Sequence, residues 1–259
     1  MTGTKHHAMI VQPRDTEFLR LLAMLGVVDR DIYMMVAGFH SITRANTRLL
    51  KLYQAGLLRR FFLGSGGGRK ALYALSPKGA QLAGVPFRGP RRKQGELLIG
   101  DFYVQHQLTI NSVYCTLARK PILVPCVTFL RWLPFYEPIA PNLKLIPDGY
   151  AELATPTGKI CAFIEVDLGH ENLLVWREKA KQYLQLALTG EFERRFREPR
   201  FRVLVLVNSD RRLRSIRKAV TAVTKKIFWF ATLEATSSNF FAPVWLRPTG
   251  DQPKPLIEN

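Results

Sequence analysis

In Leu145-Ile-Pro-Asp-Gly-Tyr-Ala-Glu152 and in Cys161-Ala-Phe-Ile-Glu-Val-Asp167, an apolar run is followed at once by a carboxylate. Glu165 and Asp167 flank a single valine, and residues two apart in a strand point to the same face of the sheet. When the segment that carries Asp148 pairs beside that strand, three carboxylates converge on one point. The two stretches therefore predict neighbouring strands with an acidic site at one end.

Three converging carboxylates suit a hard divalent cation, because Mg²⁺ and Mn²⁺ prefer oxygen ligands. We therefore expect Asp148, Glu165 and Asp167 to be metal ligands and catalytic acids. Lys179 follows on an expected helix, where it would stabilise charge on the scissile phosphate or orient the attacking water. The competing interpretation is that an isolated Glu-x-Asp lies at an exposed strand end and is simply solvated.

Strand and helix signals alternate around these stretches. The continuous apolar run of residues 201–207 is typical of a strand buried on both faces. A hairpin turn is expected at residues 155–158. The remaining elements are expected as strands at 121–136, 227–232 and 243–246 and as helices at 172–188 and 210–225. The sequence predicts an α+β or α/β fold, with helices on both sides of a mixed sheet.

The first third of the chain carries a different pattern, with three helix signals followed by two strand signals. The helices are expected over residues 16–25, 29–36 and 43–55, and the strands over 57–63 and 71–75, with a glycine-rich turn between them. Three helices followed by a β-hairpin with a basic tip are the layout of a winged helix-turn-helix. The third helix would then be the recognition helix.

Basic and amide side chains gather on this third helix, on the hairpin and on the linker that follows. Such side chains reach phosphates and base edges when a helix lies in the major groove. The expected DNA contacts are Arg44, Asn46, Arg48, Lys51, Arg59, Arg60, Arg69, Lys70, Arg91, Arg92 and Lys93. Two alternatives stay open: the charges face water, or the winged helix docks a protein partner.

The charge of the whole chain supports a polyanionic partner. The 259 residues have a formal net charge of +18 at pH 7. Residues 1–95 hold 16 of the 38 Lys and Arg but only 4 of the 20 Asp and Glu. We expect double-stranded DNA rather than a membrane, since no apolar run approaches the roughly 18 residues that a membrane span needs.

Other classes of site lack their motifs. The three cysteines are far apart and form no CxxC pair, so we expect no zinc site and a reducing cytoplasm. The glycine-rich turn has neither the GxxxxGK[ST] nor the GxGxxG spacing, so we expect no bound nucleotide. The N-terminus shows no signal-peptide core.

The acidic stretches resemble the PD-(D/E)xK nuclease superfamily. Pro147-Asp148, Glu165-Val-Asp167 and Lys179-xxx-Tyr183 stand at the places of its motifs. The sequence departs from the superfamily at Asp167, where a lysine is usual. The departure has two interpretations: the lysine has moved to Lys179, or the domain keeps the fold and has lost cleavage.

The order of motifs resembles the replication-relaxation family of bacterial plasmids and integrative elements over roughly residues 15–245. It is carried by Tyr-Ala-Leu-Ser-Pro-Lys-Gly at residues 73–79, by His106 and Asn111, and by the acidic stretches. The resemblance implies a bacterial cytoplasmic protein, associated with the nucleoid or a plasmid, that acts in replication or mobilisation. It also implies relaxation of supercoiled DNA through nicking.

The sequence thus predicts four segments: a winged helix-turn-helix at 1–86, a basic linker at 87–95, a nuclease-like domain with its connecting helix at 96–247, and a flexible tail at 248–259. The function expected is sequence- or structure-specific DNA binding with metal-dependent nicking or endonuclease activity. The alternative is a non-catalytic replication or mobilisation factor, or a transcriptional regulator, on an inactive nuclease fold. A homodimer is an open alternative to a monomer.

Two further residues have auxiliary roles in this interpretation. His170 would act as a general acid or base, contact phosphate or cap the following helix, and Tyr183 would pack beneath the site. A tyrosine nucleophile of the relaxase kind would need a cluster of three histidines. The five histidines of the chain are scattered and predict no such cluster.

Overall fold

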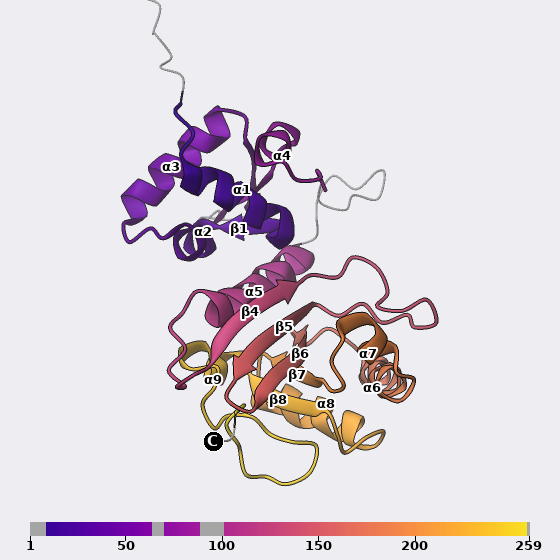
Figure 1. Ribbon diagram of the computed structural model, residues 1–259. Helices are drawn as coiled ribbons and strands as arrows, with labels where there is room; N and C mark the ends of the chain where they lie inside the picture. Colours follow the sequence, from indigo (N-terminus) through magenta and orange to yellow (C-terminus); the bar gives the residue numbers. More distant parts are fainter. Residues whose placement is uncertain (1–8, 64–69, 89–100, 258–259) are drawn as a thin grey trace, which may run out of the picture. The chain divides into compact units, whose positions relative to one another are not determined.

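The computed structural model describes residues 9–63, 70–88 and 101–257 (Figure 1). The chain divides into two compact units, Met1–Cys115 and Thr116–Asn259. The predicted boundary lies earlier, at 87–95, and most of that linker lies outside the described residues, as do Arg69, Arg91, Arg92 and Lys93. Most of helix α5 (Asp101–Ala118) therefore belongs to the first unit, although the sequence analysis assigns it to the second domain.

The first unit has the three helices and the hairpin that the sequence predicts. Its elements are α1 (Pro13–Leu25), β1 (Val27–Asp29), α2 (Arg30–Ala37), α3 (Ile42–Gln54), β2 (Leu58–Leu63), β3 (Lys70–Leu75) and α4 (Pro77–Ala83). The strands form an antiparallel sheet in the order β1-β3-β2. Asp29 caps α2 and Ser41 caps α3, each accepting a backbone N–H of the first turn, so both helices begin within one residue of their expected starts.

Helices α1 and α4 differ from the prediction, and the residues at their N-termini explain why. Helix α1 begins at Pro13 rather than at Thr16, and Asp15 bonds back to the backbone N–H of Gln12 within the first turn. Helix α4 was not predicted as a helix, although Ser76 caps it and a proline occupies its first position. Those two residues are a start signal that the sequence contains.

The second unit is built on a mixed sheet, as predicted, and five strands of it lie in the described residues. The strands are β4 (Thr128–Leu133), β5 (Gly149–Thr155), β6 (Gly158–Asp167), β7 (Arg202–Val207) and β8 (Phe228–Thr232). Their spatial order is β4-β5-β6-β7-β8, in which β4, β5 and β6 run antiparallel and β6, β7 and β8 run parallel. The helices are α6 (Leu173–Leu188), α7 (Glu191–Phe196), α8 (Asp210–Thr221) and α9 (Leu233–Ser238).

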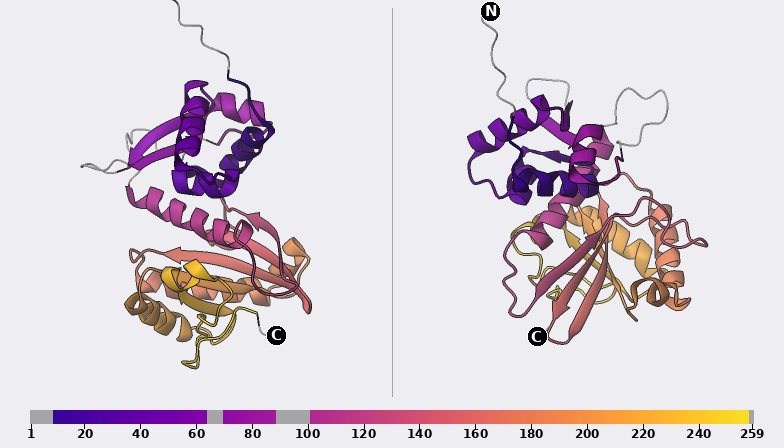
Figure 2. Two further views of the ribbon diagram at one scale, coloured as in Figure 1. Left: turned by 90° about the vertical axis from the view of Figure 1, so that its left-hand side faces the viewer. Right: turned by 45° about the horizontal axis from the view of Figure 1, so that its top comes forward.

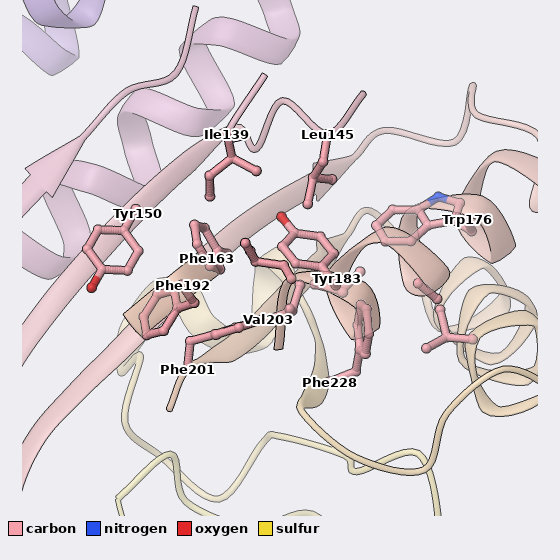
Figure 3. Packing of buried hydrophobic residues seen from close by; sticks show 14 of the residues in the cluster. Ile139, Leu145, Tyr150, Phe163, Trp176, Tyr183, Phe192, Phe201, Val203 and Phe228 are labelled. Carbon is pink, nitrogen blue, oxygen red and sulfur yellow. The ribbon is translucent and has the colours of Figure 1, made fainter. Parts of the chain in front are cut away.

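Helices α6, α7 and α8 lie along one face of this sheet (Figure 2), and a core rich in aromatic residues joins them to it. The ring of Tyr183 on α6 lies 5.4 Å from that of Phe163 on β6 and 5.7 Å from that of Phe228 on β8, measured between centroids (Figure 3). Phe192 and Phe201 extend the same cluster. This packing presses α6 against the end of β6, where the acidic residues lie.

The C-terminal segment corrects two predictions. Residues 243–246 do not form a continuous strand, but Leu246 makes an isolated antiparallel bridge to Phe230. Residues 248–257 do not fray, since Lys254 bridges to Trp245 and the side chain of Leu256 is fully buried. Burial of one leucine side chain contributes about 2 kcal/mol to the free energy of unfolding. The polar composition of the tail gives no sign of this contribution.

Strand β4 lies at one edge of the sheet and pairs with β5 alone. Its register shifts between Phe129 and Arg131, so a bulge interrupts the ladder. At the opposite edge, Phe230 of β8 exchanges backbone hydrogen bonds of 2.8 and 2.9 Å with Leu246. Both edges of the sheet are thus interrupted or partly covered.

Candidate functional site

The two carboxylates of β6 point toward the same helix, as residues two apart in a strand should. Glu165 and Asp167 are almost completely buried, with exposed fractions of 0% and 1%. Their partners on α6 are Trp176, Lys179 and Tyr183, which lie on one helical face because they are three and seven residues apart. Strand β6 and helix α6 together build the site.

Glu165 lies in the innermost position. Its Oε1 accepts a hydrogen bond of 2.5 Å from the hydroxyl of Tyr183, and its Oε2 lies 2.9 Å from Nζ of Lys179. Burial, aided by the neighbouring carboxylate of Asp148, raises the pKa of Glu165 to about 7 against the opposing effects of Lys179 and Tyr183. Tyr183 is therefore buried against Glu165.

Lys179 joins this buried acid to an acid nearer the surface. Its Nζ lies 2.9 Å from each carboxylate oxygen of Glu171, which the sequence analysis did not single out. Burial lowers the pKa of Lys179, but Glu165, Glu171 and Asp148 outweigh that effect and hold it well above the usual value. The lysine therefore stays charged between carboxylates.

Asp167 is fully engaged in protein contacts. Arg212 of α8 donates two hydrogen bonds of 2.7 Å to its carboxylate oxygens, while the indole N–H of Trp176 and the backbone N–H of Gly169 donate at 3.0 and 2.7 Å. Burial alone would raise the pKa of Asp167, but the hydrogen bonds from Arg212 and Trp176 hold it below its ordinary value. This carboxylate is stabilised as an anion without a metal.

Asp148 lies immediately before β5, next to the carboxyl end of β6. Its Oδ2 accepts a hydrogen bond of 2.8 Å from the backbone N–H of Val166, which places it beside Glu165. The predicted pairing of the two acidic stretches is therefore correct. Within residues 9–63, 70–88 and 101–257, however, no group of three or more acidic, histidine or cysteine side chains is arranged to hold a metal ion.

The expected three-carboxylate metal site does not fit this geometry. Asp167 is turned to Arg212 and Trp176, whereas Glu165 is turned to Lys179 and Tyr183. A metal at Asp167 would have to displace the two hydrogen bonds that Arg212 donates to its buried carboxylate. Arg212 follows Asp167 by 45 residues, and no local sequence pattern connects the two, so their pairing could not be predicted. His170 is exposed beside this cluster.

The first unit presents its polar side chains on its surface. Arg44, Asn46 and Lys51 are exposed on α3, as expected for DNA contacts. Arg48 is not: its Nε donates a hydrogen bond of 2.9 Å to Oδ1 of Asp15, and a second nitrogen pairs with the other carboxylate oxygen. Because the side chain of Asp15 is completely buried, Arg48 ties α3 to α1, and its prediction as a DNA contact is corrected.

The basic residues of the hairpin have aromatic neighbours. The guanidinium of Arg60 lies 4.5 Å from the ring centroid of Tyr53 and 5.3 Å from that of Phe62. Arg59 lies 5.4 Å from the ring of Phe61. These are cation–π distances that hold an arginine in place while leaving its charge intact.

Lys70, at the start of β3, forms an ion pair with Asp29 and is half exposed, at 49% of its side chain. Asn111 of α5, one of the residues that carry the family resemblance, is buried and donates to the backbone carbonyls of Leu25 and Val27 at 3.0 and 2.7 Å. Asn111 therefore has a structural role within the first unit.

Comparison with known proteins gives one match. The model of a family described as replication-relaxation matches residues 19–197. No curated protein and no solved structure matches the chain. The match includes α3 and the acidic residues of β6 and α6, and it ends before Arg212. In the described part of the chain, no helix is long and apolar enough to cross a membrane.

Proposed function

Because this chain belongs to the replication-relaxation family, which points to a role in the replication or relaxation of a plasmid or other mobile element, we propose that it binds double-stranded DNA through its first unit. One observation carries this proposal. Helix α3 contains no acidic residue, and it exposes Arg44, Asn46 and Lys51 to solvent. A helix with such a surface suits the negatively charged major groove.

The arrangement of the first unit supports a winged helix-turn-helix. In the order α1, β1, α2, α3, β2, β3, the hairpin β2–β3 follows the three helices and pairs with β1 in one antiparallel sheet. In this arrangement α3 enters the groove and the β2–β3 hairpin is the wing. Arg59, Arg60 and Lys70 lie on the strands of that wing, where they contact the phosphate backbone.

For the second unit we propose a PD-(D/E)xK-like fold without nuclease activity. The antiparallel pair β5–β6, the helix α6 and the parallel strand β7 follow each other in the order of that superfamily. Asp167, which stands where a lysine is usual, is bound to Arg212. The acids of this unit then stabilise the fold, and the unit acts as a clamp or dimerisation module for the DNA-binding unit.

Binding of the full chain to labelled duplex DNA, followed by fluorescence anisotropy over a range of salt concentrations, tests the proposal. We expect steep salt dependence and at least a tenfold loss of affinity in the double variant R44A/K51A. Arg194→Ala is the matched control, because Arg194 is an exposed basic residue of α7. Equal affinity of the double variant and the wild type would contradict DNA binding through α3.

A metal-dependent nickase is the second candidate function, favoured by the contact between Lys179 and Glu165 at 2.9 Å. The contact puts Lys179 beside Glu165. This is the position required if Lys179 has replaced the lysine that is usual at residue 167. Conversion of supercoiled plasmid to the open circle with Mg²⁺ or Mn²⁺ separates the two functions. Nicking that Glu165→Gln abolishes would establish the nickase, while its absence with intact DNA binding supports the non-cutting protein.

A further inference from the structure

We infer that α3 selects A·T base pairs, so that the duplex recognised by this protein has an A·T-rich core. This inference rests on the proposed DNA binding and specifies its target. It depends on which side chains occupy the outermost stripe of α3. The stripe can be derived from the buried side of the helix.

The buried side of α3 is formed by Ala45, Leu49 and Leu52, each with an exposed fraction of 0%. With about 100° between successive residues of a helix, the opposite side passes through positions 43, 47, 50 and 54. The outermost stripe therefore consists of Thr43, Thr47, Leu50 and Gln54, all of which are exposed. A helix lying in a groove presents this stripe to the base edges.

No side chain of the stripe carries a charge. Guanine is read most often by a bidentate arginine or lysine, and the stripe offers neither. Gln54 has the amide that pairs with the N6 and N7 atoms of adenine. Leu50 and the methyl group of Thr47 are apolar contacts of the kind that the thymine methyl group accepts. The chemistry of the stripe thus matches A·T pairs and not G·C pairs.

The charged residues lie beside the stripe. Arg44 and Lys51 lie on one flank, and on the other flank Tyr53 has the guanidinium of Arg60 at 4.5 Å from its ring. Positive charge on both flanks suits the phosphates on the two walls of the groove. Arg48, which could otherwise supply a guanine contact, is held by Asp15.

Selection from duplexes with a randomised 20-base-pair core, about the length that an HTH dimer covers, tests the inference with the full-length chain. We expect the selected cores to be enriched in A·T pairs, and the best of them to bind about tenfold more tightly than a G·C-rich duplex. Selected cores with no A·T enrichment would overturn the inference and leave DNA binding intact. Failure to retain any duplex would overturn both.

Two variants test the stripe directly. Gln54→Ala should lower affinity for the selected core about tenfold and leave affinity for the G·C-rich duplex unchanged, since only the adenine contact is lost. Gln81→Ala is its matched control, because Gln81 is an exposed glutamine of α4 away from α3. Thr47→Arg should raise affinity for a core with one added G·C pair. Equal discrimination by Gln54→Ala and Gln81→Ala would count against the inference.

Discussion

Each unit contains one buried aspartate paired with an arginine, and the two pairs have different consequences. In the first unit Arg48 is bound to Asp15, but Arg44 and Lys51 of the same helix stay exposed. In the second unit Arg212 binds Asp167, and the neighbouring acid Glu165 is buried as well. The first pair engages Arg48, which is one of several candidate DNA contacts. The second pair engages Asp167, and a metal site of three carboxylates needs that residue.

The comparison teaches that a side chain's partner decides its role more than its place in a motif does. Arg48 and Asp167 both stand where sequence motifs predict function, and both are held in bidentate ion pairs. Removing one partner of a buried ion pair lowers the free energy of unfolding by several kcal/mol, because the other charge stays desolvated. The predictions that follow separate residues that hold the fold from residues that contact DNA.

The largest effect is expected from Arg48→Ala. Without Arg48, the fully buried carboxylate of Asp15 keeps only the backbone N–H of Gln12, so the first unit should lose about 4 kcal/mol of unfolding free energy. Hydrogen exchange of peptides from α1 and α3, measured in the full chain, reports this loss. Arg44→Ala, one helical turn away and exposed, is the control and should keep wild-type protection. Equal protection in both variants would show that the pair does not hold α1 to α3.

Arg212→Ala should destabilise the second unit by about 3 kcal/mol, since Asp167 keeps the N–H groups of Trp176 and Gly169. All four tryptophans of the chain lie in this unit, so their fluorescence during urea unfolding reports on it alone. The adjacent Arg211 is exposed, and Arg211→Ala should shift the urea midpoint little. A midpoint unchanged by Arg212→Ala would argue that Asp167 is free to take another ligand.

Glu165 should make the second unit less stable as pH rises. Its pKa is about 7 in the folded state and near 4.5 in the unfolded chain, so between these values the folded state holds a proton that the unfolded state has released. The free energy of unfolding then falls by at most about 1.4 kcal/mol per pH unit through this window. Urea midpoints from tryptophan fluorescence at pH 5 and pH 7.5 measure the slope.

Two variants isolate this contribution. Glu165→Gln should remove the slope, because glutamine does not titrate. Glu178→Gln, at an exposed acid of α6, should keep it. A slope that persists in full in Glu165→Gln would show that other groups cause the pH dependence.

The smallest effect on stability is expected from Lys51→Ala, within about 0.5 kcal/mol, because Lys51 is exposed on α3. The same variant should lower the slope of log affinity for DNA against log salt concentration by about one. Anisotropy titrations at several salt concentrations give this slope. An unchanged slope would place Lys51 away from phosphate.

Sequence patterns predicted the local features because their causes are local. Helices α3 and α6 begin within one residue of their expected starts, because Ser41 and Asn172 cap them, and Glu165 and Asp167 share a face because of strand geometry. The pairings of Arg48 and Arg212 were not predictable in this way. They depend on how α1 meets α3 and how α8 meets β6, which tertiary packing decides. The burial of Leu256 was missed for the same reason, since the tail around it is rich in proline and polar residues.

The interrupted edges of the five-stranded sheet have a consequence for self-association. An open strand edge is a template on which a second chain can add a strand, and uncontrolled addition leads to aggregates. The bulge between Phe129 and Arg131 interrupts that template on β4, and the bridge from Leu246 to Phe230 occupies part of it on β8. Both features work against edge-to-edge pairing of this five-stranded sheet between two molecules.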